Sequence, residues 1–202
     1  MSSRLLALGD SYTIGEAVPV SERWPLQLAE MAQTQGLMSA PVDVRIVAQT
    51  GWTVAELSDA LDSIESELDI PWSLVTLLIG VNDQYRGHSL ARYQSDFAQM
   101  LQRAAHWAGS PTRLRVLSIP DWGVTPFARE DHRSAAQIAA TIDAFNAVAH
   151  EVCERWDVRF IDITDLTREA ATDPTLLAED GLHPSGRDYG RWAERVLQTL
   201  GN

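Results

Sequence analysis

The sequence contains no lysine, so all 16 basic residues are arginines, and they face 28 aspartates and glutamates. The formal net charge at pH 7 is therefore -12. A surface with this excess of negative charge repels a phosphate backbone, and we expect no nucleic-acid partner. The missing lysine indicates a compositional bias and no particular function.

Cysteine and long apolar runs are also scarce. Cys153 is the only cysteine, which excludes an internal disulfide, and its apolar surroundings predict a buried thiol. No apolar run reaches the length of a membrane span, and no secretory signal precedes the Gly9-Asp10-Ser11 stretch, so we expect a cytoplasmic location. His, Asp and Glu show no metal-ligand spacing, and Gly9 does not begin a phosphate-binding glycine pattern. We therefore expect neither a metal nor a cofactor.

Strand and helix patterns alternate along the chain. Short apolar runs predict strands at residues 5–8, 72–79, 114–119 and 158–161, and alternation of apolar and polar residues predicts one at 42–48. Helical spacing of apolar residues predicts helices at 24–31, 54–64, 90–101 and 135–152, and a last helix that Ser185 caps and that extends to Leu200. This alternation predicts an α/β fold, a three-layer α/β/α sandwich with about five parallel strands in flavodoxin-like order. We expect residues 1–202 to form one domain.

The segments that follow strands are longer than the returns from helix to strand. We expect loops at 11–21, 81–89 and 121–134, at the end of the sheet where parallel-sheet proteins bind ligands. Segment 121–134 is interrupted by glycine and proline, and we interpret it as a lid that selects the substrate.

Complementary chemical groups fall in or near these loops. A serine hydroxyl becomes a good nucleophile when an imidazole takes its proton, and a carboxylate fixes the tautomer of that imidazole. Ser11, His183 and Asp180 can supply these three parts. The oxyanion that forms on attack needs hydrogen-bond donors, which the Ser11 and Gly51 amides and the Asn82 side chain can supply. Taken singly, Asn82 can be a turn residue and His183 a helix-entry residue.

Four blocks in this order resemble the SGNH, or GDSL-type, hydrolase family. They are Gly9-Asp10-Ser11-Tyr12, the region of Gly51, Gly80-Val81-Asn82-Asp83 and Asp180-Gly181-Leu182-His183-Pro184. The second block departs from the family pattern, because Gln49 stands where an asparagine is common. The resemblance implies that Ser11 is the nucleophile, His183 the base and acid, and Asp180 its orienting partner. It also implies an oxyanion hole formed by Ser11, Gly51 and Asn82.

Other residues near these blocks have less definite roles. Tyr12, Trp52 and Trp122 lie beside the site loops and can line a substrate pocket, although ordinary packing explains each of them equally well. We expect Asp10 and Asp83 to bind local backbone amides rather than take part in the chemistry.

The blocks lead to one main hypothesis and two alternatives. The main hypothesis is a serine esterase that hydrolyses a small-molecule carboxylic ester, with a short-chain acyl or acetyl group, through an acyl-enzyme on Ser11. An acyltransferase that uses the same intermediate is the first alternative. A catalytically inactive binding module on the same fold is the second. The sequence indicates neither the natural ester nor the oligomeric state.

Overall fold

The sheet is the centre of the fold. The structure is a computed structural model that describes residues 2–68 and 71–201. Within these residues, five parallel strands form one sheet: β1 (Ser3–Gly9), β2 (Val42–Ala48), β3 (Leu74–Leu78), β4 (Leu114–Leu117) and β5 (Arg159–Ile161). Their order is β2-β1-β3-β4-β5, which confirms the predicted flavodoxin-like arrangement.

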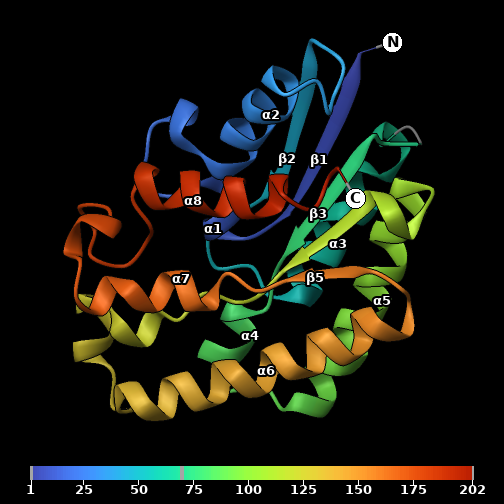
Figure 1. The fold of residues 1–202 in the computed structure, drawn as a ribbon. Helices are drawn as coiled ribbons and strands as arrows, with labels where there is room; N and C mark the ends of the chain where they lie inside the picture. Colours follow the sequence, from blue (N-terminus) through green and yellow to red (C-terminus); the bar gives the residue numbers. More distant parts are fainter. Residues whose placement is uncertain (1, 69–70, 202) are drawn as a thin grey trace.

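Helices cover both faces of this sheet, as Figure 1 shows. They are α1 (Ser11–Ile14), α2 (Trp24–Thr34), α3 (Val54–Ile64), α4 (Val81–Tyr85), α5 (Leu90–Ala108), α6 (Ala135–Arg155), α7 (Thr164–Arg168) and α8 (Gly186–Leu197). Helices α2 and α8 pack together on one face, and α5 packs between α3 and α6 on the other. The three predicted layers are therefore confirmed.

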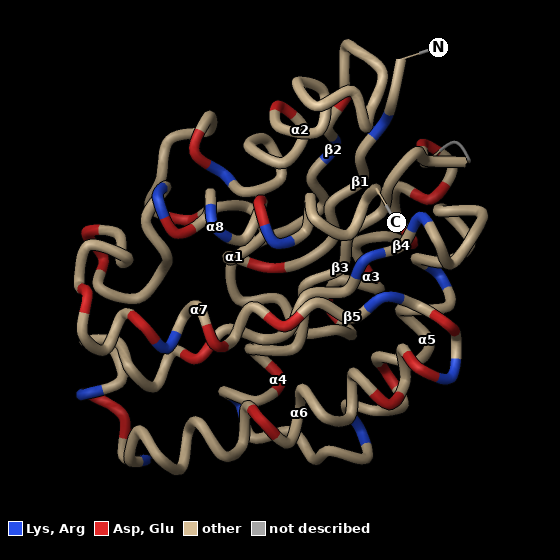
Figure 2. The backbone as a smooth tube through the Cα atoms, in the orientation of Figure 1, with Lys and Arg blue, Asp and Glu red and all other residues tan. Residues whose placement is uncertain are grey.

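Local sequence signals explain where several helices begin. The side chains of Thr53 and Glu56 form the predicted capping box at the start of α3, and Ser185 caps α8 by accepting from the Asp188 amide. All five residues of β3 are buried, as expected for a strand covered on both faces. Figure 2 shows that charges of both signs lie on the surrounding helices and loops, while β3 carries none.

Several predicted boundaries differ from the structure by a few residues, and three of the differences concern the site loops and the last helix. The segments that begin at Ser11 and Val81 were expected to be loops, but each starts with a short helix, α1 or α4. Helices of four or five residues complete barely one turn, so they produce no apolar periodicity to detect. At the other end of the chain, α8 ends at Leu197, and Leu200 lies beyond it.

Strand register explains how distant loops meet. Gly9, at the end of β1, pairs with Ala48 of β2 on one side and with Leu78 of β3 on the other. A Cβ at Gly9 would lie 2.4 Å from the Leu78 carbonyl oxygen. The chain is therefore tightly packed at this point. The segments that follow β1, β2 and β3 therefore leave the sheet side by side.

The thiol of Cys153 is buried on α6, as predicted, and burial raises its pKa to about 12. None of the helices in the described ranges combines the length and the apolar character that a bilayer crossing requires.

Candidate active site

Ser11 is the first residue of α1, directly after the end of β1. Asp10 caps this helix, because its Oδ1 accepts a hydrogen bond from the Tyr12 amide at 3.0 Å. The Ser11 side chain borders a cavity of about 100 Å³. The residues that line this cavity are Ser11, Tyr12, Val81, Asn82, Tyr85, Trp122, Phe127, Leu182 and His183. The fold thus places a serine from the beginning of the chain and a histidine from its end around one space.

His183 is held by Asp180, three residues earlier. The Nδ1 atom of His183 lies 2.6 Å from Oδ2 of Asp180, and Oδ1 of Asp180 accepts from the Leu182 and His183 amides at 3.0 Å each. Partial burial raises the pKa of the Asp180 carboxyl, but the hydrogen bonds from the His183 ring and the two amides outweigh it, and the net pKa lies below its usual value. An ionised carboxylate can only accept, so Nδ1 donates, and a neutral ring keeps its lone pair on Nε2.

Aromatic packing also restricts the imidazole. The ring centroids of Tyr12 and His183 are 5.1 Å apart, and Tyr12 in turn contacts Trp192 of α8 at 6.2 Å. His183 is only 6% exposed. Its ring is therefore fixed by a carboxylate and by a buried aromatic side chain.

The turn after β2 brings Gly51 close to Asn82. The Trp52 amide donates to the Gln49 carbonyl at 3.2 Å, and Gly51 has φ +86°, a left-handed value that favours glycine at this position of a tight turn. The Asn82 side chain donates to the Trp52 carbonyl at 2.9 Å. Gly51 and Trp52 are held beside Asn82, but neither is among the residues that line the cavity.

Arg86 makes two contacts that the sequence did not indicate. Its guanidinium donates to the Gly51 carbonyl at 2.5 Å and to Oε1 of Glu56 at 3.0 Å. Glu56 also belongs to the capping box of α3, so Arg86 connects the turn after β2 to the start of that helix. Thr50 adds a further anchor by donating to Glu16, which follows α1.

Two buried carboxyls lie beneath the site. Burial, assisted by the nearby Asp83 carboxylate and opposed by the hydrogen bond from the Tyr12 amide, raises the pKa of Asp10 to about 8. Burial also raises the pKa of Asp83, against hydrogen bonds from the Val54 amide and the His88 ring, each 3.0 Å long. Asp10 binds a local amide as expected. Asp83 also binds a backbone amide as expected, but this partner is not local, because Val54 lies on α3, 29 residues away.

Segment 121–134 forms one wall of the cavity. It contains two short 3₁₀ helices, Trp122–Val124 and Pro126–Glu130, and the Trp122 indole donates to Oε1 of Gln84 at 3.0 Å. Asp121 accepts from the Gly123 amide at 2.9 Å and from Arg168 at 2.8 Å. The wall is thus attached to both α4 and α7.

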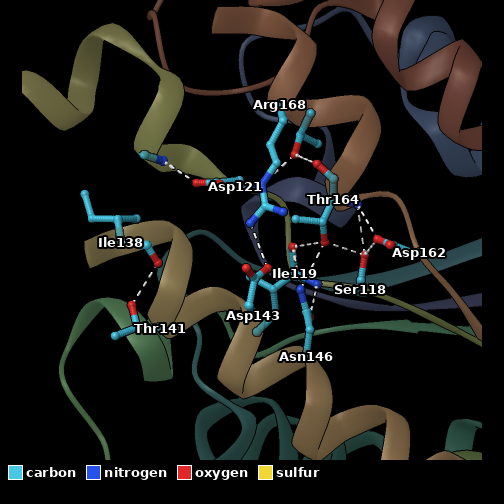
Figure 3. A network of polar contacts seen from close by, with 12 residues as sticks. Ser118, Ile119, Asp121, Ile138, Thr141, Asp143, Asn146, Asp162, Thr164 and Arg168 are labelled. Carbon is cyan, nitrogen blue, oxygen red and sulfur yellow. Dashed lines mark hydrogen bonds and ion pairs between the residues drawn. The ribbon is translucent and has the colours of Figure 1, made fainter. Parts of the chain in front are cut away.

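A polar network behind this wall connects it to the segment after β4 and to α6 and α7 (Figure 3). Arg168 bridges Asp121 and Asp143, while Asn146 of α6 bonds both the amide and the carbonyl of Ile119. Thr164 joins the same network through Asn146. We expected 121–134 to be a lid that selects the substrate; its anchoring favours a fixed wall, and its part in substrate selection stays a prediction.

Tyr12 and Trp122, two of the predicted pocket residues, do line the cavity. Sequence reasoning missed Val81, Tyr85 and Leu182 as lining residues. Tyr85 is three residues after Asn82 on α4, a spacing that would have identified it if the helix had been recognised. Within the described ranges, no group of three or more His, Cys, Asp or Glu side chains is arranged to hold a metal ion.

Comparison with known proteins matches residues 7–191 to the GDSL-like Lipase/Acylhydrolase family. The chain belongs to this family. It is therefore a carboxylic ester hydrolase, as the four sequence blocks predicted, and the family acts on small-molecule esters. Among curated proteins, it is 24% identical to an arylesterase of Vibrio mimicus over 200 residues, covering 98% of this chain and 88% of that protein. It is also 24% identical to thioesterase 1/protease 1/lysophospholipase L1 of Escherichia coli K12, over 98% of this chain and 85% of that protein.

Solved structures share the fold. A crystal structure of TesA superposes with a TM-score of 0.73 at 22% identity, covering 98% of each chain. An acetyl xylan esterase from Geobacillus stearothermophilus superposes with a TM-score of 0.72 at 18% identity, covering 98% of this chain and 94% of that chain. These likenesses confirm the predicted fold class.

Proposed function

We propose that this family member is a serine esterase that hydrolyses short-chain esters through an acyl-enzyme on Ser11. The observation that carries the proposal is the single cavity lined by Ser11, Asn82 and His183, in which Asp180 holds the far side of the imidazole. One alternative remains as an outcome of the tests: acyl transfer from the same intermediate.

The proposed reaction follows from the His183 ring, in which Nδ1 donates to Asp180 and Nε2 is left to accept a proton. His183 Nε2 accepts the hydroxyl proton of Ser11 as Ser11 Oγ attacks the ester carbonyl carbon. The carbonyl π electrons move to the oxygen and form a tetrahedral oxyanion. When this intermediate collapses, the bond to the alcohol oxygen breaks and His183 returns the proton to the leaving alcohol. Water then attacks the acyl carbon while His183 takes one of its protons. The bond from this carbon to Ser11 Oγ breaks and Oγ takes the proton from His183, which releases the free acid and regenerates Ser11.

Donors for the oxyanion come from three places. The Ser11 amide lies in the first turn of α1, where amides have no partner within the helix. The Asn82 side chain has two N–H groups, and only one of them is used by the Trp52 carbonyl. The Gly51 amide is the third donor in this proposal, supplied by the turn that Asn82 and Arg86 anchor.

Cavity size supports a short acyl group. Pockets that enclose drug-sized ligands measure about 300–1,000 Å³, several times the volume of this partly open cavity. The names of the relatives agree with ester chemistry but point to different substrates, since one is an arylesterase and another an acetyl xylan esterase.

The test is the Ser11→Ala variant, assayed with p-nitrophenyl acetate and p-nitrophenyl butyrate. We expect kcat to fall by at least about 10³-fold and labelling by a fluorophosphonate probe to disappear, because the nucleophile is lost. Ser63→Ala, at an exposed serine of α3, is the matched control and should keep both. A folded Ser11→Ala protein with undiminished turnover would refute the mechanism. Transfer to added alcohols instead of release of free acid would identify an acyltransferase.

A further inference from the structure

An aromatic cluster lies at the opening of the cavity. Tyr85 and Phe127 are 45% and 38% exposed, although both line the cavity, and Trp122 lies between them as a buried member. The ring centroids of Trp122 lie 5.4 Å from Tyr85 and 6.0 Å from Phe127, and those of Tyr85 and Phe127 are 6.3 Å apart. Large exposed apolar side chains that gather beside a nucleophile point to a ligand that covers them.

The cluster is held in place rather than free to collapse. The Trp122 indole is bonded to Gln84, and the Phe127 amide donates to the Gly181 carbonyl at 3.2 Å, close to His183. Arg133 lies over the Trp122 and Tyr85 rings, 5.1 and 5.5 Å from their centroids. These contacts come from α4, from the segment after β4 and from the segment before α8.

The cluster carries no net charge. Arg133 binds Asp131 through two parallel contacts of 2.8 Å, and these hydrogen bonds hold the pKa of the Asp131 carboxyl well below its usual range. The guanidinium is therefore neutralised by its own neighbour and offers little attraction to an anionic substrate. An uncharged ligand fits this opening better than a carboxylate or a phosphate does.

The angles between the rings favour an aromatic ligand. Trp122 meets Tyr85 at 75° and Phe127 at 70°, so the cluster presents both faces and edges, the arrangement in which aromatic rings attract one another. Apart from the hydroxyls of Tyr12 and Tyr85, the polar side chains of the lining are those assigned to the reaction: Ser11, Asn82 and His183. A sugar needs several further hydrogen bonds that this lining lacks.

We infer that Tyr85, Trp122 and Phe127 form the binding site for the alcohol part of the substrate and that this part is an uncharged aryl group. The inference rests on the proposed function, with the short acyl group beside Ser11 and the departing aryl alcohol against the exposed aromatic side of the cavity. It predicts aryl acetates as the preferred class of substrate.

The experiment compares 2-naphthyl acetate with methyl acetate, which share an acyl group, across Tyr85→Ala, Phe127→Ala and Phe127→Leu. For each variant, kcat/KM for 2-naphthyl acetate is divided by kcat/KM for methyl acetate, and the result is divided by the same ratio for the unsubstituted protein. The difference in intrinsic reactivity between the two esters then cancels. We expect the two alanine variants to lower this ratio about 3- to 10-fold, mainly through KM, with a smaller effect of Phe127→Leu, which keeps apolar volume. Trp156→Ala, at an exposed tryptophan beyond the far end of α6, should leave the ratio unchanged. Equal losses on both esters would overturn the inference.

Binding to the Ser11→Ala protein separates this inference from the proposed mechanism. Calorimetry should detect saturable binding of 2-naphthol to this protein. The double variant Ser11→Ala, Phe127→Ala should bind 2-naphthol more weakly. Cyclohexanol and methyl xyloside should bind to Ser11→Ala more weakly than 2-naphthol does. Naphthol binding together with full activity of Ser11→Ala would refute the mechanism and retain the aryl site. Tighter binding of methyl xyloside than of naphthol would refute the aryl site and indicate a carbohydrate ester.

Discussion

Asp10→Asn should make stability less dependent on pH. The Asp10 side chain is fully buried, its Oδ1 caps α1, and its Oδ2 has no hydrogen-bond partner among the described residues. Burial, assisted by the nearby Asp83, raises the pKa of Asp10 from its ordinary value of 3.8 to about 8. Between these two values, the folded protein keeps a proton that the unfolded chain has released. The contribution of this group to stability is therefore fully present below the lower value and is lost as pH rises to about 8.

The size of the effect follows from the shift. Each pH unit between the two pKa values costs about 1.4 kcal/mol, so the free energy of unfolding falls by about 4 kcal/mol between pH 4 and pH 7 because of this group alone. Asparagine keeps the oxygen that accepts from the Tyr12 amide but cannot ionise. The side-chain amide group of asparagine takes the place of the unpartnered Oδ2. Burying its N–H groups without a partner lowers the free energy of unfolding by about 1–3 kcal/mol, and this loss does not depend on pH.

The assay is urea denaturation followed by tryptophan fluorescence at a series of pH values from 4 to 8. The free energy of unfolding of Asp10→Asn, relative to the unsubstituted protein, should rise by about 4 kcal/mol between pH 4 and pH 7. Asp59→Asn, at an exposed position of α3, controls for the change of charge. A difference between Asp10→Asn and the unsubstituted protein that stays constant over this range would refute the argument.

Two further predictions concern the arginines that anchor the site. Arg168→Met removes the partner of the buried Asp121 carboxylate and should lower the free energy of unfolding by about 2–3 kcal/mol, less than for a fully buried pair because Arg168 is 38% exposed. Adding Asp121→Asn should recover part of this loss in urea denaturation, and a single variant as stable as the unsubstituted protein would contradict the prediction. Arg86→Met should lower kcat for p-nitrophenyl acetate about 3- to 30-fold with little change in KM, because the turn that carries Gly51 loses an anchor. The control is Arg92→Met, which removes an exposed ion pair of α5, and an equal kcat in both variants would argue against a positioning role for Arg86.

Periodic patterns in the sequence were enough to predict most of the fold. The strand expected at 42–48 has those bounds as β2, and the capping box at Thr53 begins α3 as predicted. Both signals are local, since alternation and capping involve residues within a few positions of one another. The family blocks were also readable, because the types of residues and their order are properties of the chain itself.

Contacts between distant segments were decided only by the tertiary structure. Tyr85 was missed because α4 is too short to show periodicity. Asp83 binds Val54, 29 residues away, and Arg86 binds Gly51, 35 residues away. The same holds for Asp121 and Arg168, which are 47 residues apart. Such pairs depend on which strands are neighbours and in what register, and this arises only when the whole sheet packs. The sequence by itself determined most of the secondary structure and the chemical groups of the site, while the packed sheet decided which strands are neighbours and which side chains hold those groups in place.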